Sequence, residues 1–150
     1  MSVLAEVVGA VASVATAVGV VMAWWQIREA RQQAASSFED SLAHEYREIA
    51  RRLPVAAMLG EPLSEDELQR NLENFFQYLH LSSSQVNLRQ RGRIRTDTWD
   101  TWRGGIESNL QLPAFCTAWE QIKQRSPSIF DGLRRLEAEA FGSDPREWNH

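Results

Sequence analysis

Residues 7–25 contain no charged residue and no proline, and this run constrains the chain more than any other feature. At about 1.5 Å of rise per residue, a helix of this length spans roughly 28 Å, close to a hydrocarbon core of about 30 Å. Valine-rich helices are poor in water but acceptable in lipid, where the backbone satisfies its own hydrogen bonds. The run therefore predicts a transmembrane segment over residues 1–27, and the alternative is a helix buried in the protein's own core.

The residues that flank the run predict its orientation. Trp24 and Trp25 end it, and Arg28 and Arg31 follow, whereas no Lys or Arg precedes it. Indole rings favour the membrane interface, and arginines favour the cytoplasmic side. We therefore expect a single-pass protein of the inner membrane, with its N-terminus outside and its C-terminal domain in the cytoplasm. Because the run ends in tryptophans rather than in a small-residue cleavage site, a cleaved signal peptide is not expected.

Small residues recur at four-residue spacing inside the same run. Gly9, Ser13 and Ala17 form one row, and Gly19 belongs to a second. Such rows allow helices to approach closely in lipid, where side-chain packing drives association. The pattern predicts a homo-oligomer that assembles through this helix, and the alternative is a monomeric anchor.

The rest of the chain is polar, with a helical pattern of apolar residues. The full chain carries 16 Lys and Arg against 20 Asp and Glu, a net charge of −4, which disfavours general binding to duplex nucleic acid. Gly and Pro are absent between Gly19 and Pro54, so a juxtamembrane helix is expected to end near Leu53. The prediction is an all-α fold in which the transmembrane helix continues into a cytoplasmic bundle of four to five helices. Its segments are 1–27 (transmembrane), 28–53 (juxtamembrane helix) and 54–150 (helical cytoplasmic domain). In the last segment, a helix is expected to begin at a Ser64–Glu67 capping box and to end near residue 91. Further helices are expected over 96–112, 113–125 and about 129–141.

Few residues predict chemistry. None of the three histidines stands at metal-ligand spacing from another histidine or from the single cysteine. The sequence therefore predicts neither a metal nor a cofactor. Cys116 stands among apolar residues and is interpreted as a small buried side chain. His80 follows an aromatic stretch and precedes serines, and it is the one candidate for a general acid or base. No catalytic residue is assigned, and the alternative for His80 is a half-buried structural position.

The most unusual polar feature is a cluster of arginines at the end of the second predicted helix. Guanidinium groups bind phosphates in pairs of hydrogen bonds, so these side chains are candidates for contact with a partner, RNA or anionic lipid. In the alternative, they complement a helix C-terminus and pair with nearby acids such as Asp97, Asp100 and Glu107. The cluster consists of Arg89, Arg91, Arg93 and Arg95.

Several short motifs follow the apolar start in order. They are Ser84-Gln85-Val86, Gly92-Arg93-Ile94, Thr98-Trp99, Trp102, Gly105-Ile106, Pro113-Ala114-Phe115 and Ala118-Trp119. Together with a start that ends in Trp24 and Trp25, this order resembles a family of small, uncharacterised single-span bacterial membrane proteins. The resemblance covers most of the chain. It implies an N-terminal span with a helical cytoplasmic domain and carries no established activity.

The architecture is also similar to that of the membrane accessory protein of type VI-B CRISPR systems. That resemblance implies a ring-forming pore and a role in antiviral defence. Related helical ribonuclease domains carry an arginine four to six residues before a histidine. Here Arg70 precedes His80 by ten residues, which argues against direct RNA cleavage.

These observations favour a non-enzymatic, membrane-anchored and self-associating protein that acts as an effector or interaction module. Its expected partners are membrane lipid, further copies of itself and a protein or RNA–protein complex. One alternative is a degenerate ribonuclease-like enzyme that uses His80. Another is a simple membrane tether for a soluble partner.

Overall fold

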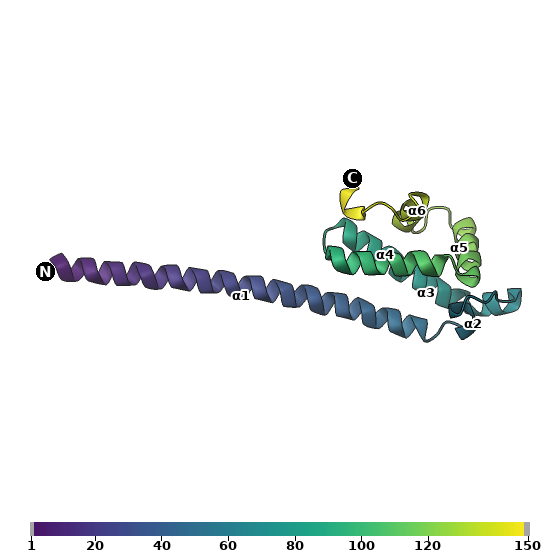
Figure 1. Ribbon diagram of the computed structural model, residues 1–150, viewed down its shortest axis with the longest axis horizontal. Helices are drawn as coiled ribbons and strands as arrows, with labels where there is room; N and C mark the ends of the chain where they lie inside the picture. Colours follow the sequence, from purple (N-terminus) through teal and green to yellow (C-terminus); the bar gives the residue numbers. More distant parts are fainter. Residues whose placement is uncertain (1, 149–150) are drawn as a thin grey trace. The chain divides into compact units, whose positions relative to one another are not determined.

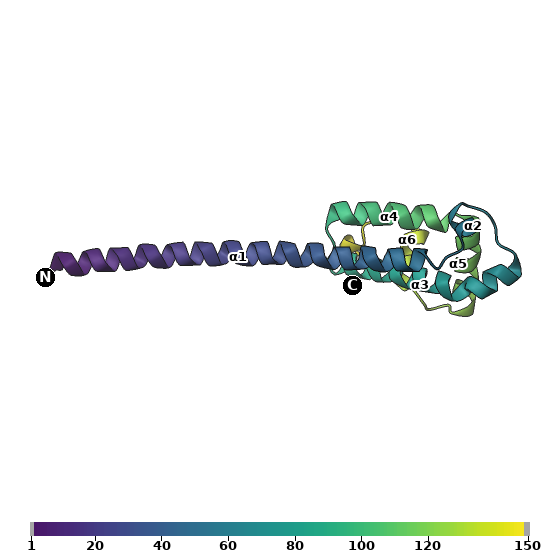
Figure 2. The same cartoon turned by 90° about the horizontal axis from the view of Figure 1, so that it is seen from below.

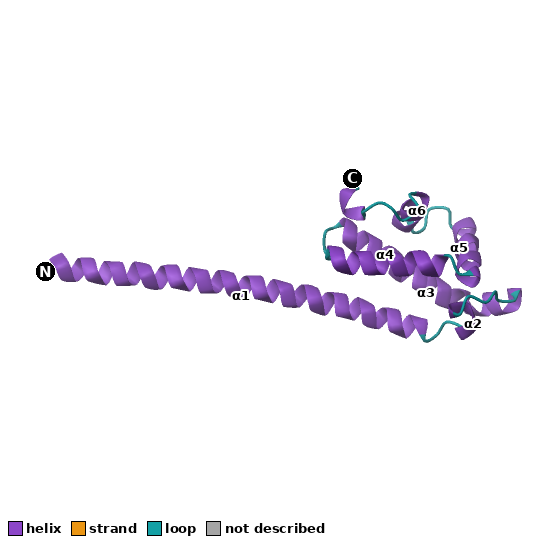
Figure 3. Cartoon of the chain, viewed as in Figure 1, coloured by secondary structure: helices purple, strands orange, loops and turns teal. Residues whose placement is uncertain are grey.

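The computed structural model describes residues 2–148, apart from the side chains of residues 2, 4–15 and 17. Over the described range the regular structure is helical, as Figure 3 shows, which confirms the all-α prediction. The helices are α1 (Ser2–Ala50), α2 (Val55–Met58), α3 (Glu65–Gln90), α4 (Thr96–Leu110), α5 (Pro113–Arg125) and α6 (Asp131–Ala138), followed by a 3-10 turn η1 (Pro145–Glu147).

The chain divides into two compact units, Met1–Phe38 and Glu39–His150. The boundary falls inside α1 and within the segment 28–53 that the sequence marks as juxtamembrane. The first unit contains only helix α1. The second contains the last turns of α1 together with α2 to α6, and it holds the hydrophobic core.

In the first unit, the side chains of residues 18–34 are exposed. Among the described residues, no helix offers a stretch apolar and long enough to traverse a bilayer. The side chains of Gly9, Ser13 and Ala17, and of most of the run before residue 18, lie outside the described residues. The transmembrane segment therefore stays a prediction, as does assembly through the small residues.

Local sequence signals explain where the helices begin and end. The Ser64 hydroxyl accepts from the Glu67 backbone N–H at 3.3 Å, and the Glu67 carboxylate accepts from the Ser64 N–H at 3.1 Å. This capping box starts α3 as predicted. Helix α1 ends at Ala50, three residues before the predicted end, because the ring of Pro54 clashes with a helical carbonyl four residues earlier.

Aromatic side chains fill the core of the second unit. Phe75 and Tyr78 of α3 both meet the Phe115 ring of α5 edge to face, with ring centroids 5.0 and 5.1 Å apart. Helix α3 packs against α5 and α6, and both views place α2 and α5 at the same end of the bundle (Figures 1 and 2). Phe75, Trp99, Phe115 and Trp119 are buried in this core, while Phe76 and Trp102 are half-buried against it.

The interpretation of Cys116 as a buried residue is wrong, because its side chain is exposed on α5. The buried face of this helix follows Phe115, Trp119 and Ile122 at helical spacing. Residue 116 lies about 100° around the helix from Phe115 and falls outside that face. Apolar neighbours along the sequence do not predict the burial of Cys116, because helix periodicity decides which side chains face the core.

Candidate functional site

Arg89 of the predicted arginine cluster is part of the core. It is 2% exposed, and its Nε donates to the Asp144 carboxylate at 2.8 Å. Its remaining nitrogens donate to the Ile94 carbonyl at 2.7 Å and to the Thr96 hydroxyl at 3.2 Å. The hydrogen bonds from Arg89 lower the pKa of Asp144. With its donors engaged inside the fold, Arg89 has no surface to offer a partner or a phosphate.

Arg95 also makes an internal contact. Its Nε donates to the Glu39 carboxylate at 3.1 Å, its backbone N–H donates to the same group at 3.2 Å, and the Thr98 hydroxyl adds a bond of 2.8 Å. Glu39 is 5% exposed. Burial opposes its ionisation, but the hydrogen bonds from Arg95 and Thr98 outweigh burial and lower its pKa. This contact fastens the first residue of the second unit to the start of α4.

The other two members of the cluster face solvent. Arg91 and Arg93 are exposed and form no ion pair or side-chain hydrogen bond with any described residue. Internal contacts therefore account for Arg89 and Arg95, although their acids are Asp144 and Glu39 rather than those of α4. Half of the cluster remains free for contact with an external anion.

A cleft of about 370 Å³ opens in the second unit between the last turns of α1 and the helices α3 and α4. This volume lies within the range of about 300–1,000 Å³ that small-molecule sites occupy. Three helices supply its walls: Ala43, Tyr46 and Arg47 from α1, Tyr78 and Gln85 from α3, and Thr101, Trp102, Gly105, Ile106 and Asn109 from α4.

Polar atoms are few in the cleft and specifically placed. The Asn109 amide nitrogen donates to the Tyr78 hydroxyl at 3.0 Å. Burial raises the pKa of Tyr78 to about 12, so its hydroxyl stays protonated. Gln85 is 6% exposed and makes no side-chain hydrogen bond with any residue of the described chain. Its side chain lines the cleft, so its amide can hydrogen-bond to water or to a ligand there.

Local sequence patterns do not predict this cleft. A usable signal was present in Gln85 itself, which stands four residues after Leu81 on the buried face of α3. A polar residue on the buried face of a helix is unusual, because burial of an unpaired amide costs free energy. Such a residue therefore indicates a candidate binding site more strongly than an apolar residue at the same position. The residues of α1 and α4 that complete the cleft carry no comparable signal, since the packing of the helices brings them together.

His80, the candidate for an enzymatic alternative, is exposed on α3, between the buried residues Leu79 and Leu81. It borders a depression of about 410 Å³ that is lined mainly by hydroxyl and amide side chains and by Asp131. No arginine of the cluster is among the lining residues. The arginine–histidine pair of the helical ribonuclease domains is therefore not brought together by the residues that line this depression.

No group of three or more potential metal ligands occurs among the described residues. Comparison of the chain with protein-family models, with curated proteins and with solved structures gave no match. The two resemblances drawn from the sequence, to single-span bacterial membrane proteins and to a CRISPR accessory protein, therefore stay predictions.

Proposed function

We propose that this protein is a non-enzymatic binding module that an N-terminal helix holds in a membrane. The observation that carries the proposal is the exposure of residues 18–25, each of which is apolar or a glycine. Their exposed fractions include 65% for Val20 and Trp25 and 58% for Met22. Contiguous apolar surface of this kind needs a cover in an aqueous environment.

The distribution of these side chains favours lipid over a protein groove. Successive residues of an α-helix differ by about 100° in direction, so an uninterrupted apolar stretch faces every side. A groove covers one face of a helix, whereas a bilayer surrounds it. Residues 7–17 are also uncharged and mostly apolar, so the apolar stretch extends toward the N-terminus.

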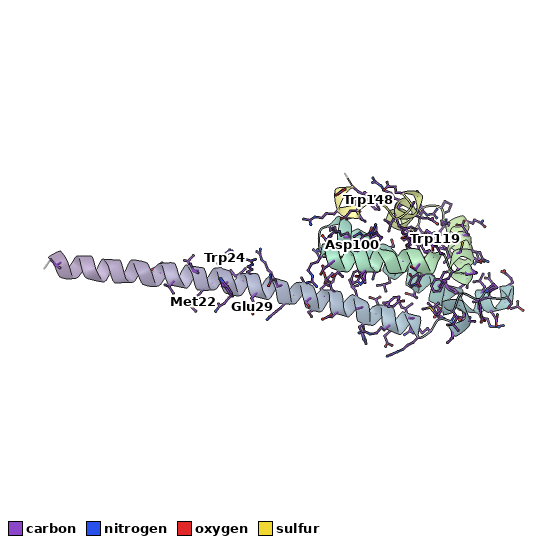
Figure 4. The ribbon with its side chains drawn as sticks, in the orientation of Figure 1. Met22, Trp24, Glu29, Asp100, Trp119 and Trp148 are labelled. Carbon is purple, nitrogen blue, oxygen red and sulfur yellow. The ribbon has the colours of Figure 1, made fainter. Side chains whose placement is uncertain are left out.

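The end of the apolar stretch has the chemistry of a membrane interface. The Arg28 guanidinium lies 5.6 Å from the centroid of the Trp24 ring. In Figure 4, Met22 and Trp24 project from α1, and Glu29 follows on the same helix. An indole paired with a guanidinium suits the headgroup layer, and the charged residues beyond it suit water. The contact between Trp24 and Arg28 supports a cytoplasmic boundary of the proposed anchor near Arg28.

The binding role belongs to the second unit. Its core is complete in itself, and it presents a cleft lined by the Gln85 amide as well as two free arginines. These features can hold a partner, and none of them forms a catalytic pair. Recognition in the cytoplasm by a protein fixed in the membrane is the function that this combination supports best.

Flotation of the full-length chain with liposomes tests the anchor. The wild-type protein is expected to float with vesicles and to resist extraction at alkaline pH. A double variant, Val20→Lys with Val21→Lys, places two charges in the apolar stretch and should remain at the bottom of the gradient. A matched control, Ala34→Lys with Ser36→Lys, adds the same charges to exposed positions of α1 and should float. Wild-type protein that stays with the soluble fraction contradicts the proposal.

A further inference from the structure

The side-chain amide of Gln85 lines the cleft. It is 6% exposed and lacks a hydrogen-bond partner within the described chain. Its amide atoms are not sealed off, because Trp119 Nε1 is the one fully buried polar side-chain atom without a partner among the described residues, so water or a ligand in the cleft can reach them. Asn109 lies in the same cleft, and its amide nitrogen is already used by Tyr78, which leaves its amide oxygen free as an acceptor.

Aromatic side chains from each of the three helices line the cleft near these amides. Tyr46 and Tyr78 meet edge to face with ring centroids 6.3 Å apart. Trp102 of α4 is half-buried and also lines the cleft. Aromatic side chains favour planar rings through offset stacking and edge-to-face contacts. The cleft thus offers aromatic surface beside a donor and acceptor pair, which is the combination that recognises a heteroaromatic base.

A free cation stands at the rim of the cleft. Arg47 is exposed, lines the cleft and forms no side-chain ion pair with a described residue. The lining residues include no Asp or Glu, so the cleft does not favour a cationic ligand. Arginine binds phosphate oxygens through charge-assisted hydrogen bonds.

We propose that this cleft binds a nucleotide. The base lies against Tyr46 and Trp102, Gln85 hydrogen-bonds its edge, and Arg47 pairs with its phosphate. The proposal goes beyond membrane anchoring, because it names the ligand class of the cytoplasmic unit. It is tested by ligand binding in detergent, so its failure and a failure of liposome flotation are separate results.

The glycines of α4 provide a matched pair of variants. A Cβ added at Gly105 or at Gly104 meets no atom within 4 Å, so either position accepts a side chain without a backbone clash. Gly105 lines the cleft, whereas Gly104 does not. Gly105→Phe therefore fills the cleft, and Gly104→Phe makes the same change in helix composition outside it.

Isothermal titration calorimetry of the full-length chain in detergent micelles tests the proposal. The probes are AMP, GMP, CMP and UMP, with adenosine and inorganic phosphate as fragments. At least one nucleotide is expected to bind with a Kd below about 1 mM, the weak end of specific binding. Gly105→Phe should abolish this binding, and Gly104→Phe should leave it unchanged.

Two further variants probe the polar contacts. Arg47→Ala changes an exposed side chain and should weaken nucleotide binding about tenfold or more, whereas Arg91→Ala removes an exposed arginine outside the cleft and should not. Gln85→Leu should lower affinity and alter the preference among the four bases. The proposal is overturned if no nucleotide binds, if Gly105→Phe binds as well as the wild type, or if phosphate alone binds as tightly as the nucleotide.

Discussion

The guanidinium of Arg89 and the carboxylate of Asp144 join the end of α3 to the C-terminal segment across 55 residues of sequence. Arg89 is 2% exposed, and it also satisfies the Ile94 carbonyl that follows α3. The Arg89 side chain thereby links the end of α3, the connection to α4 and the C-terminal segment. Its role in the fold explains why an arginine occupies a core position.

Replacement of Arg89 should destabilise the second unit strongly. Arg89→Ala leaves Asp144 and the Ile94 carbonyl without their donor, and we expect a loss of about 3–5 kcal/mol in the free energy of unfolding. Arg89→Lys should recover only part of this loss, because an ammonium group cannot reproduce the paired donors. Urea denaturation measures both effects, and Arg91→Ala, at an exposed position, should change stability by less than about 0.5 kcal/mol. Equal stability of Arg89→Ala and Arg91→Ala contradicts this role.

The stability of the second unit should fall in acid. Hydrogen bonds hold the pKa values of Glu39 and Asp144 below their ordinary values of 4.5 and 3.8. The unfolded chain then takes up protons at a higher pH than the folded one. The stabilisation is present above the unfolded pKa values and is lost as the pH falls through the folded ones.

Urea denaturation at pH 7 and in steps below pH 5 measures this dependence. Glu39→Gln should lower stability at pH 7 by about 1–3 kcal/mol, because the variant loses the carboxylate charge of the ion pair with Arg95 and one of its two acceptor oxygens. The variant should also lose less stability than the wild type between pH 5 and the folded pKa. An identical pH profile for wild type and variant would rule out a role for this carboxylate.

Two consecutive residues after α6 have left-handed backbones. Ala140 has a φ of 51°, and Phe141 has a φ of 56°. A residue with a Cβ pays about 1–2 kcal/mol for this conformation, which glycine avoids. Ala140→Gly should therefore raise the free energy of unfolding by up to about 1 kcal/mol. Ala138→Gly, at an exposed helical position of α6, should lower it, and thermal unfolding of both variants checks the opposite signs.

Self-association through the N-terminal helix is tested at Gly19. A Cβ placed there meets no atom within 4 Å, so Gly19→Leu is compatible with the helix itself. If the small residues pack helices together, Gly19→Leu should reduce the mass of the detergent-extracted particle. Val20→Leu adds bulk to an already large neighbour and should leave the mass unchanged. A wild-type particle with the mass of one chain would exclude assembly by this route.

Much of the fold follows from the sequence, since local rules determine it. The Ser64–Glu67 box and Pro113 mark helix starts, and both starts lie where they are predicted. Helical periodicity also identifies the main aromatic core residues. The exposure of Cys116 shows the limit of this reasoning, because composition around a residue does not fix which way it faces.

The site was far less predictable than the fold. Arg89 and Arg95 read as surface arginines because their partners, Asp144 and Glu39, lie more than 50 residues away in sequence. The cleft assembles residues from three helices, and only Gln85 stands out along the chain. The burial of these arginines and the position of the cleft both depend on packing between segments that are distant in sequence. No local sequence pattern predicts that packing.

The position of residue 20 in a bilayer tests the central claim most directly. Cys116 is the one cysteine, so a Cys116→Ser background with Val20→Cys accepts a single nitroxide label. In liposomes, we predict that molecular oxygen relaxes this label more strongly than a water-soluble nickel complex does, while a label at Ser36→Cys shows the reverse. If the nickel complex reaches residue 20 as readily as residue 36, the helix is in water and the membrane anchor is wrong.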